Sequence, residues 1–161
     1  MRIAAVALAA LVVVPSAAAA TFSFTVTTAS PVTAPGVTLT GDDQTKTFTI
    51  VSQVAYTGTS NTAGWNIQSS QTQPTTGTRT IPYFAVTAGS SACASSCTTN
   101  PTNSIAYPLT LSGTAQKIYN AAVNTGRGTF NVTSTYQVTY PANAIAGTYS
   151  STVTLTGATG P

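Results

Sequence analysis

The chain has 161 residues, which is enough for one domain with a core of its own. Charged residues make up 4% of it, the formal net charge is +3, and neither histidine nor glutamate occurs. The few cations are scattered singly and form no basic stripe, so the composition speaks against nucleic-acid binding. Without histidine or glutamate there is no Ser-His-Asp or Cys-His pairing and no histidine-bearing metal site, so we expect no enzyme and no cofactor.

Residues 1–20 have the pattern of a secretory signal peptide. Arg2 gives a positive start, residues 3–14 are an apolar run too short to span a bilayer stably, and the alanines up to Ala20 form a small-residue cleavage site. We therefore predict cleavage after Ala20 and a mature chain that begins at Thr21. No later apolar stretch is long enough to span a membrane, so we expect an exported protein that is secreted or attached to the cell surface.

In the first half of the mature chain, three stretches alternate between apolar and polar residues, as half-buried strands do. They are residues 21–29, 45–56 and 64–71. The side chains that this alternation predicts to face inward are Phe22, Phe24, Val26, Phe48, Ile50, Val54, Tyr56, Trp65, Ile67 and Ser69. Between the first two stretches, Asp42 and Asp43 belong to a predicted turn, because aspartate side chains bond their own backbone.

The second half is less regular. Residues 79–86 predict a strand that Pro82 confines to a sheet edge. Residues 87–104 form the longest irregular segment, which we predict to be a loop. Residues 107–111 predict a short strand, and residues 115–123 fit either a strand or one or two helical turns.

Residues 128–157 give the clearest pattern in the chain. Apolar residues alternate from Phe130 to Tyr140, and Tyr149, Val153 and Leu155 share one parity in the return segment. We predict two antiparallel strands that pair as a hairpin through a Pro- and Gly-bearing connection. Together with the other stretches, they predict an all-β fold: one antiparallel Ig-like or Greek-key β-sandwich over residues 21–161, with about eight or nine short strands.

The two cysteines, Cys93 and Cys97, lie in the predicted loop. An even number of cysteines in an exported chain indicates a disulfide. Closing so small a ring removes only about 2 kcal/mol of loop entropy from the unfolded state. The bond would tie down one segment and leave the two sheets of the sandwich unlinked.

Trp65 is the only tryptophan, and two interpretations of it are open. An exposed tryptophan could stack on a sugar, because aromatic residues are enriched where recognition occurs. Alternatively, it could pack between the sheets, as a buried tryptophan does in Ig-type sandwiches. Its shared parity with Ile67 favours the core.

The segment from Gly64 to Ile67, together with residues 146–156, resembles the WxL-domain surface proteins. In that family, a Trp-x-Leu motif lies mid-domain and a second one follows an Ala-Gly-Thr-Tyr turn near the end. Here Ile67 replaces the first leucine, and Leu155 stands where the second tryptophan would be expected. The resemblance implies a secreted β-sandwich held non-covalently on the bacterial cell wall, by contact with peptidoglycan or another wall polymer. Trp65, Ile67 and Tyr149 would be the candidate contacts.

A structural role in a surface filament or coat is the alternative to wall binding. The strand at residues 21–29 could be donated to the open sheet edge of a neighbouring copy, which would produce a homo-oligomer. The partners expected from the sequence are therefore a cell-wall polymer or other surface proteins.

Overall fold

The computed structural model describes residues 2–3, 21–57 and 63–161. Apart from Arg2 and Ile3, the predicted signal peptide lies outside the described residues, and so does the expected cleavage site at Ala20. Every strand pair in the described part of the chain is antiparallel. No described helix is long and apolar enough to cross a membrane. The predicted all-β class is confirmed.

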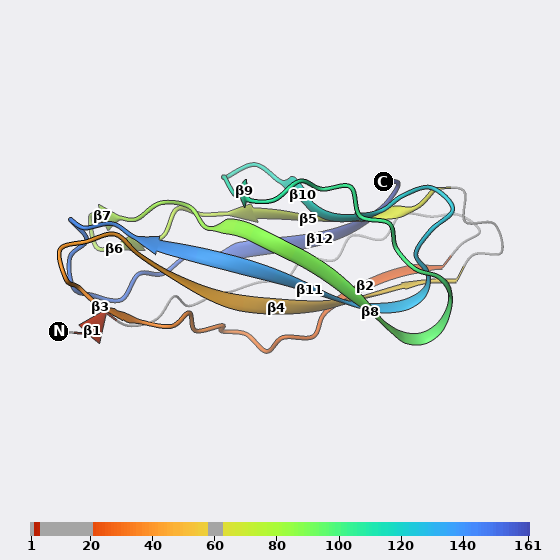
Figure 1. Cartoon of the computed structure of the whole chain (residues 1–161), viewed down its shortest axis with the longest axis horizontal. Coiled ribbons are helices and arrows are strands. Elements are labelled where there is room, and N and C mark those ends of the chain that lie inside the picture. The colour runs from red at the N-terminus through yellow and green to blue at the C-terminus, as the bar shows by residue number, and fades with distance from the viewer. Residues whose placement is uncertain (1, 4–20, 58–62) are drawn as a thin grey trace.

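Two sheets form the two layers of the molecule, and their strands run along its long axis (Figure 1). The larger sheet has five strands in the spatial order β2 (Phe22–Val26), β4 (Gln44–Tyr56), β11 (Arg127–Tyr140), β8 (Ala85–Thr99) and β9 (Leu109–Thr110). The smaller sheet has the order β10 (Gln116–Ala121), β5 (Trp65–Gln71) and β12 (Val153–Thr159). Two short pairs complete the fold: β1 (Arg2–Ile3) with β3 (Val37–Thr38), and β6 (Thr75–Thr76) with β7 (Arg79–Thr80).

The core lies between the two sheets and is rich in aromatic side chains. β11 alternates strictly between half-buried and buried residues over its 14 residues, as its sequence predicts. Phe48 of β4 stacks on Tyr136 of β11 at a centroid distance of 5.3 Å, and its ring also meets the edge of Phe84. Large fully buried side chains include Trp65, Tyr136, Tyr140, Tyr149, Phe84 and Phe130.

The predicted hairpin at residues 128–157 is wrong. β11 pairs with β4 and β8, whereas β12 pairs with β5 in the other sheet. Period-two alternation shows that one face of a strand is buried, but it does not identify the neighbouring strand. Residues 141–152 are numerous enough to carry the chain from one sheet to the other, so the two strands lie in opposite layers.

The predicted loop at residues 87–104 is also wrong for most of its length, because residues up to Thr99 belong to β8. Serine and alanine predominate in residues 87–99, which contain no valine, isoleucine or aromatic residue and therefore have a weak strand propensity. The neighbouring strand β11 supplies the hydrogen-bonding ladder and overrides that weak preference. The register between β8 and β11 shifts at three points, as β-bulges do.

One further segment differs from the prediction, and another settles a choice between strand and helix that the sequence left open. Residues 79–86 are interrupted at residues 81–84, so that β7 ends at Thr80 and β8 starts at Ala85. Residues 115–123, for which strand and helix were both open, contain the strand β10.

Candidate functional site

Trp65 lies at the start of β5 with none of its surface exposed. Its indole Nε1 donates a hydrogen bond of 2.8 Å to the backbone oxygen of Gly126, and its ring stacks on Tyr119 at 5.9 Å. A Cβ atom on Gly126 would come within 2.6 Å of the same Nε1, so the backbone rests directly on the indole. Trp65 therefore occupies the core position that its parity with Ile67 favoured.

The other two predicted contact residues are buried as well. Ile67 is 0% exposed and Tyr149 is 1% exposed. The hydroxyl group of Tyr149 accepts a hydrogen bond from the Ile145 backbone nitrogen at 3.3 Å and lies 3.2 Å from the Ile145 carbonyl oxygen. A wall polymer that touches the surface of this fold does not reach Trp65, Ile67 or Tyr149. The candidate contacts named from the sequence are thus corrected to core residues.

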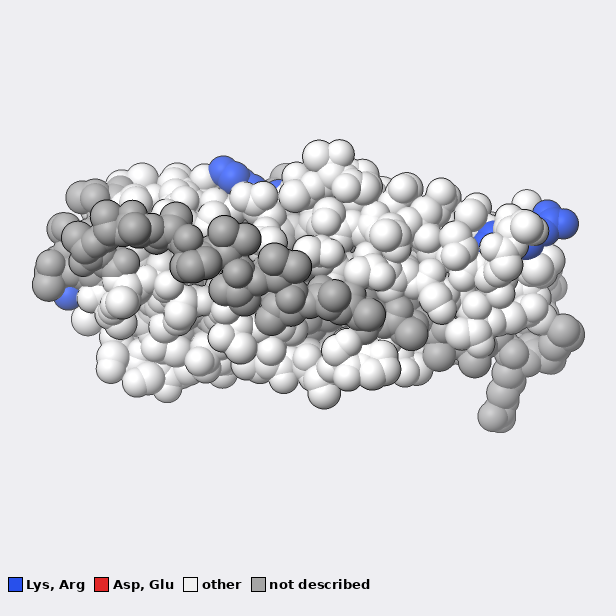
Figure 2. Space-filling view, turned by 180° about the vertical axis from the view of Figure 1, so that it is seen from behind, with Lys and Arg blue, Asp and Glu red and all other residues white. Residues whose placement is uncertain are grey.

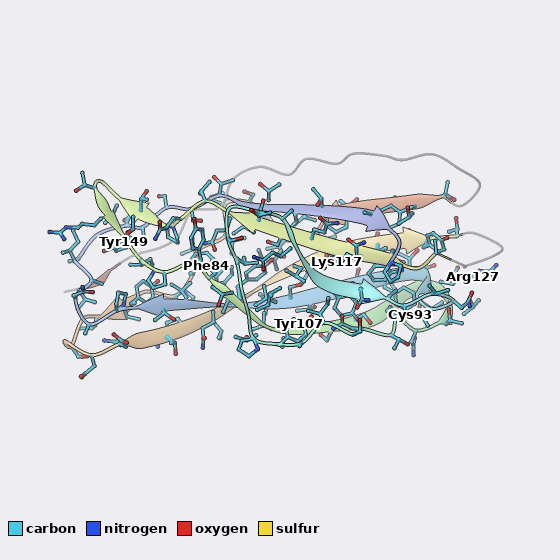
Figure 3. All side chains as sticks on the ribbon, turned by 90° about the horizontal axis from the view of Figure 1, so that it is seen from above. Phe84, Cys93, Tyr107, Lys117, Arg127 and Tyr149 are labelled. Atoms are coloured by element: carbon cyan, nitrogen blue, oxygen red, sulfur yellow. A yellow bond between two sulfur atoms is a disulfide. The ribbon has the colours of Figure 1, made fainter. Side chains whose placement is uncertain are left out.

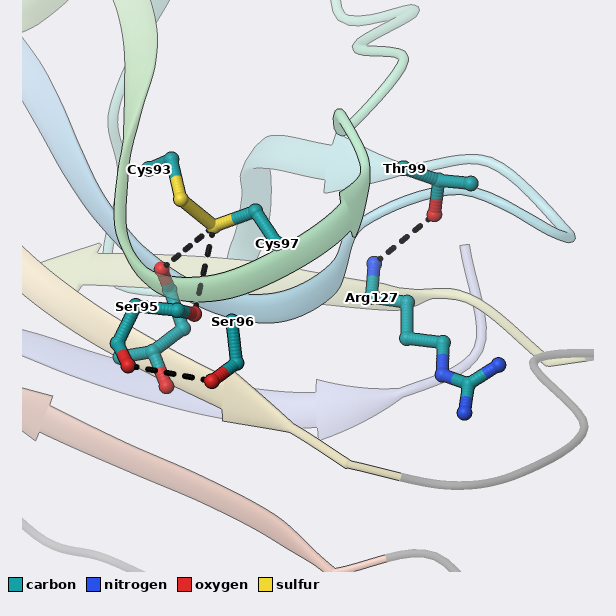
Figure 4. Close-up of a disulfide and its surroundings, with 7 residues drawn as sticks. Cys93, Ser95, Ser96, Cys97, Thr99 and Arg127 are labelled. Carbon is teal, nitrogen blue, oxygen red and sulfur yellow. Dashed lines mark hydrogen bonds between the residues drawn. A yellow bond between two sulfur atoms is a disulfide. The ribbon is translucent and has the colours of Figure 1, made fainter.

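The predicted disulfide between Cys93 and Cys97 is confirmed, with Cα atoms 5.9 Å apart. Both cysteines belong to β8, so the bond joins no two strands and leaves the sheets unlinked. The Sγ atom of Cys97 lies 3.2 Å from the backbone oxygen of Thr129 (Figure 4). A disulfide sulfur carries no proton, so this is a packing contact. The bond shapes the end of β8 where it meets the start of β11.

Asp42 and Asp43 lie in the exposed segment just before β4. The Oδ1 atom of Asp43 accepts a hydrogen bond of 2.7 Å from the backbone nitrogen of Ala142, which ties this segment to the chain that follows β11. Within the described residues, no three histidine, cysteine, aspartate or glutamate side chains group closely enough to hold a metal ion. The role of Asp43 seen here is structural.

Tyr136 and Ser69 face each other from opposite sheets at the centre of the core. The hydroxyl groups of both are buried, and no hydrogen bond of good geometry joins either of them to another group in the described structure. Burial raises the pKa of Tyr136 well above its usual range, because the phenolate would lose its solvation, and the Ser69 hydroxyl opposes that shift only partly. Tyr136 therefore stays protonated near neutral pH and is unsuited to act as a base.

The outer surface of the larger sheet is a candidate binding surface rather than a site formed by a few residues. The outward residues of β4 and β11 are mostly uncharged polar residues, with Val51 and Ala55 of β4 as apolar members, and we call this surface, with the adjoining outward side of β8, the hydroxyl face. The outward residues of β8 include Ala85, Ala88 and Ala92 beside Ser90. The polar members of the hydroxyl face are Thr45, Thr47, Thr49, Gln53, Ser90, Thr129, Asn131, Thr133, Thr135, Gln137 and Thr139. The strand register places Thr49 beside Thr135, and Ser90 beside Thr133. The result is an array of hydroxyl and amide groups along β4 and β11, which Val51 and Ala55 interrupt and which the alanines of β8 border.

Charged side chains lie away from this array. Lys46 has the opposite parity to Thr45 and Thr47 on β4, and Arg127 lies at the very start of β11. Figure 3 shows Lys117 over the middle of the molecule, whereas Arg127 lies at the end remote from Tyr149. On the side shown in Figure 2, the cations form separate spots and no acidic side chain is visible. On that side, no basic patch is visible among the residues described.

The outer surface of the smaller sheet is polar too, but its amide groups bond within the protein. The Asn66 Nδ2 atom donates to the Gly160 backbone oxygen at 2.6 Å, and the Gln68 Nε2 atom donates to Asn66 Oδ1 at 3.0 Å. Asn120 exchanges hydrogen bonds with Ser104 from the loop that precedes β9. These amides fasten the loop and the C-terminal residues to the sheet.

The hydroxyl face was not identified from the sequence as a site. Its signal was present, since threonine recurs at every second position in residues 45–49 and again at Thr133 and Thr135. That pattern indicates strands with a polar outer side, but only the pairing of β4, β11 and β8 shows that the polar sides form one surface. The chain matches no protein-family model, no curated protein and no solved structure.

Proposed function

We propose that the protein is an exported, non-enzymatic surface protein that associates non-covalently with the bacterial cell wall, through peptidoglycan or another wall polymer. The observation that carries this proposal is the distribution of charge: the outer sides of both sheets are broad and largely uncharged, and the charged side chains at their described outward positions are Arg127, at the start of β11, and Lys117 of β10. Hydroxyl and amide side chains can both donate and accept hydrogen bonds, which suits a polymer rich in hydroxyl and acetamido groups. The resemblance of residues 64–67 and 146–156 to WxL domains supports the same function.

Binding to isolated cell walls is the direct test of this proposal. Purified protein is expected to sediment with peptidoglycan at low salt and to remain bound at about 1 M salt, because contacts between uncharged groups are not screened by ions. Sodium dodecyl sulfate–polyacrylamide gels of the pellet and supernatant measure the bound fraction. Complete recovery in the supernatant at low salt would overturn the proposal. Release by salt would assign the binding to Lys117 and the other cations instead.

A structural role by strand exchange is a second candidate, and one observation favours it. β2 lies at the edge of the larger sheet, where it pairs with the last residues of β4, from Ser52 to Tyr56. Its Phe24 is 4% exposed and packs so closely against Gly157 that a Cβ on that glycine would lie 2.7 Å from the phenylalanine ring. An edge strand that contributes one large core side chain is suited to exchange between copies of the chain.

Strand-exchanged assemblies resist detergent, so they are recognised on a denaturing gel run without heating. If the chain assembles through β2, an unheated sample will give a ladder of oligomers that collapses to one band after boiling. The Phe24→Ala variant serves as the control, because it removes the side chain that the exchanged strand would insert. A single monomer band from cell-surface material, before and after heating, would rule out this assembly.

A further inference from the structure

The two outer sheet surfaces differ in how many polar groups are free to meet a ligand. On the smaller sheet, the amides of Asn66, Gln68 and Asn120 form hydrogen bonds inside the protein. Threonine side chains without a hydrogen bond to any residue in the described ranges occur on both surfaces, but they are more numerous on the hydroxyl face, where Thr133 and Thr135 are examples, than on the smaller sheet, where Thr154 and Thr156 are. Displacing water from hydroxyl groups that have no protein partner disrupts no internal structure. The hydroxyl face is therefore the better docking surface of the two.

One internal pair on the hydroxyl face still leaves groups for a ligand. The Nε2 atom of Gln53 donates to the Oδ1 atom of Asn131 at 3.1 Å, across the β4–β11 boundary. This bond fixes the orientation of both amides and leaves the Asn131 Nδ2 and Gln53 Oε1 atoms for outside partners. A fixed donor and a fixed acceptor lie side by side, with Thr129 and Thr133 on either side of Asn131 along β11 and the apolar Val51 and Ala55 on either side of Gln53 along β4.

The charge and shape of the surface indicate what kind of polymer it accepts. From Thr129 to Thr139 on β11 and from Thr45 to Ala55 on β4, the outward positions are uncharged, so a polyanion gains no attraction there. β11 has 14 residues, which gives about 40 Å of extended surface. Because long strands twist, a flexible chain can follow this surface better than a flat crystalline face can.

We infer that the hydroxyl face is the wall-contact surface, and that it takes an uncharged, hydroxyl-rich glycan chain lying along β11. This inference rests on the proposed wall association and names the site and the chemical class of its ligand. The outward positions of β4, β11 and β8 carry no aromatic side chain that could stack on a sugar. Each sugar is therefore held weakly by hydrogen bonds, and useful affinity comes from several sugars bound at once.

A matched pair of double variants tests the site. Thr133→Val with Thr135→Val removes two hydroxyl groups from the hydroxyl face, and Thr154→Val with Thr156→Val removes two from the outward side of β12 in the opposite sheet. Valine keeps the branched shape and the strand preference of threonine, so both proteins are expected to fold, which circular dichroism checks. We expect the first pair to bind isolated walls about tenfold more weakly and the second pair to bind like the wild type.

The ligand class is tested on walls before and after acid extraction of their anionic polymers. The inference expects the wild type to bind both preparations equally, and it expects soluble neutral glycan fragments to compete. Equal binding by the two double variants would overturn the site, and loss of binding after extraction would overturn the ligand class. In both outcomes, the wild-type protein would still bind intact walls. They can therefore be distinguished from failure of the proposed function, in which the wild-type protein binds no wall at all.

Discussion

The Trp65→Ala variant is expected to unfold, or to lose about 3–5 kcal/mol of its free energy of unfolding, as proteins do when a large buried aromatic side chain is removed. The side chain is 0% exposed and stacks on Tyr119. Its loss would also leave the Gly126 backbone oxygen without the indole N–H that now donates to it. The free energy of unfolding of a whole domain is only about 5–15 kcal/mol, so this one substitution is expected to remove a large part of it.

Urea denaturation followed by circular dichroism measures the effect, because the variant contains no tryptophan for fluorescence. Val123→Ala is the control, since this side chain is apolar but 48% exposed and its truncation should change stability little. Trp65→Phe should fall between the two, because it keeps much of the buried area and loses the N–H donor. A Trp65→Ala protein with wild-type stability and no wall binding would contradict the core assignment and restore the contact interpretation.

Gly128→Ala is the second change for which we expect a large loss, about 2 kcal/mol or more. Gly128 has a φ angle of +126°, which side-chain-bearing residues rarely adopt. A Cβ atom there would lie 2.6 Å from the Cα atom of Cys97 and 2.8 Å from the backbone oxygen of Ser96. The Cα atom of Cys97 is part of the ring that the Cys93–Cys97 disulfide closes, and the Ser96 oxygen is attached to that ring, so both have little freedom to move aside.

Thermal and urea unfolding of Gly128→Ala should be compared with those of Gly113→Ala. Gly113 has open space where a Cβ would stand and no positive φ, so its replacement should be neutral or stabilise the fold by up to about 1 kcal/mol. In a protein that also carries Cys93→Ala and Cys97→Ala, the penalty of Gly128→Ala should shrink because the opened ring can relax. An unchanged penalty in that background would disprove the explanation by a rigid ring.

Residues that alternate along a single strand were predictable, because burial of one face is a local property of an extended chain. Phe24, Ile50, Trp65 and Phe130 are all inward-facing by sequence parity and buried in the structure. The disulfide followed from the pairing of cysteines in a chain expected to be exported. The inward positions needed only the order of neighbouring residues, and the disulfide needed in addition the expected export of the chain to an oxidising compartment.

Strand partners could not be predicted in the same way. The backbone groups that pair strands are alike in every residue, so the sequence of β11 fits β12 as well as it fits β4 or β8. Residues 87–99 could not be predicted for a related reason. Their own strand preference is weak, and they form a strand because β11 offers a hydrogen-bonding ladder. Pairing is settled by which strands can be brought together while both sheets bury their apolar sides.

By itself the sequence determined the all-β class, the inward parity of the strands and the Cys93–Cys97 bond, because each depends on the local order of residues. The tertiary structure alone decided that β11 and β12 belong to opposite sheets, and it settled the choice between core and contact, which the parity of Trp65 and Ile67 had favoured as core, by burying Trp65, Ile67 and Tyr149. It also decided that the threonines of β4 and β11 form one uncharged surface. A side chain's neighbours across a sheet come from distant parts of the chain, so a shared surface exists only after the strands have paired.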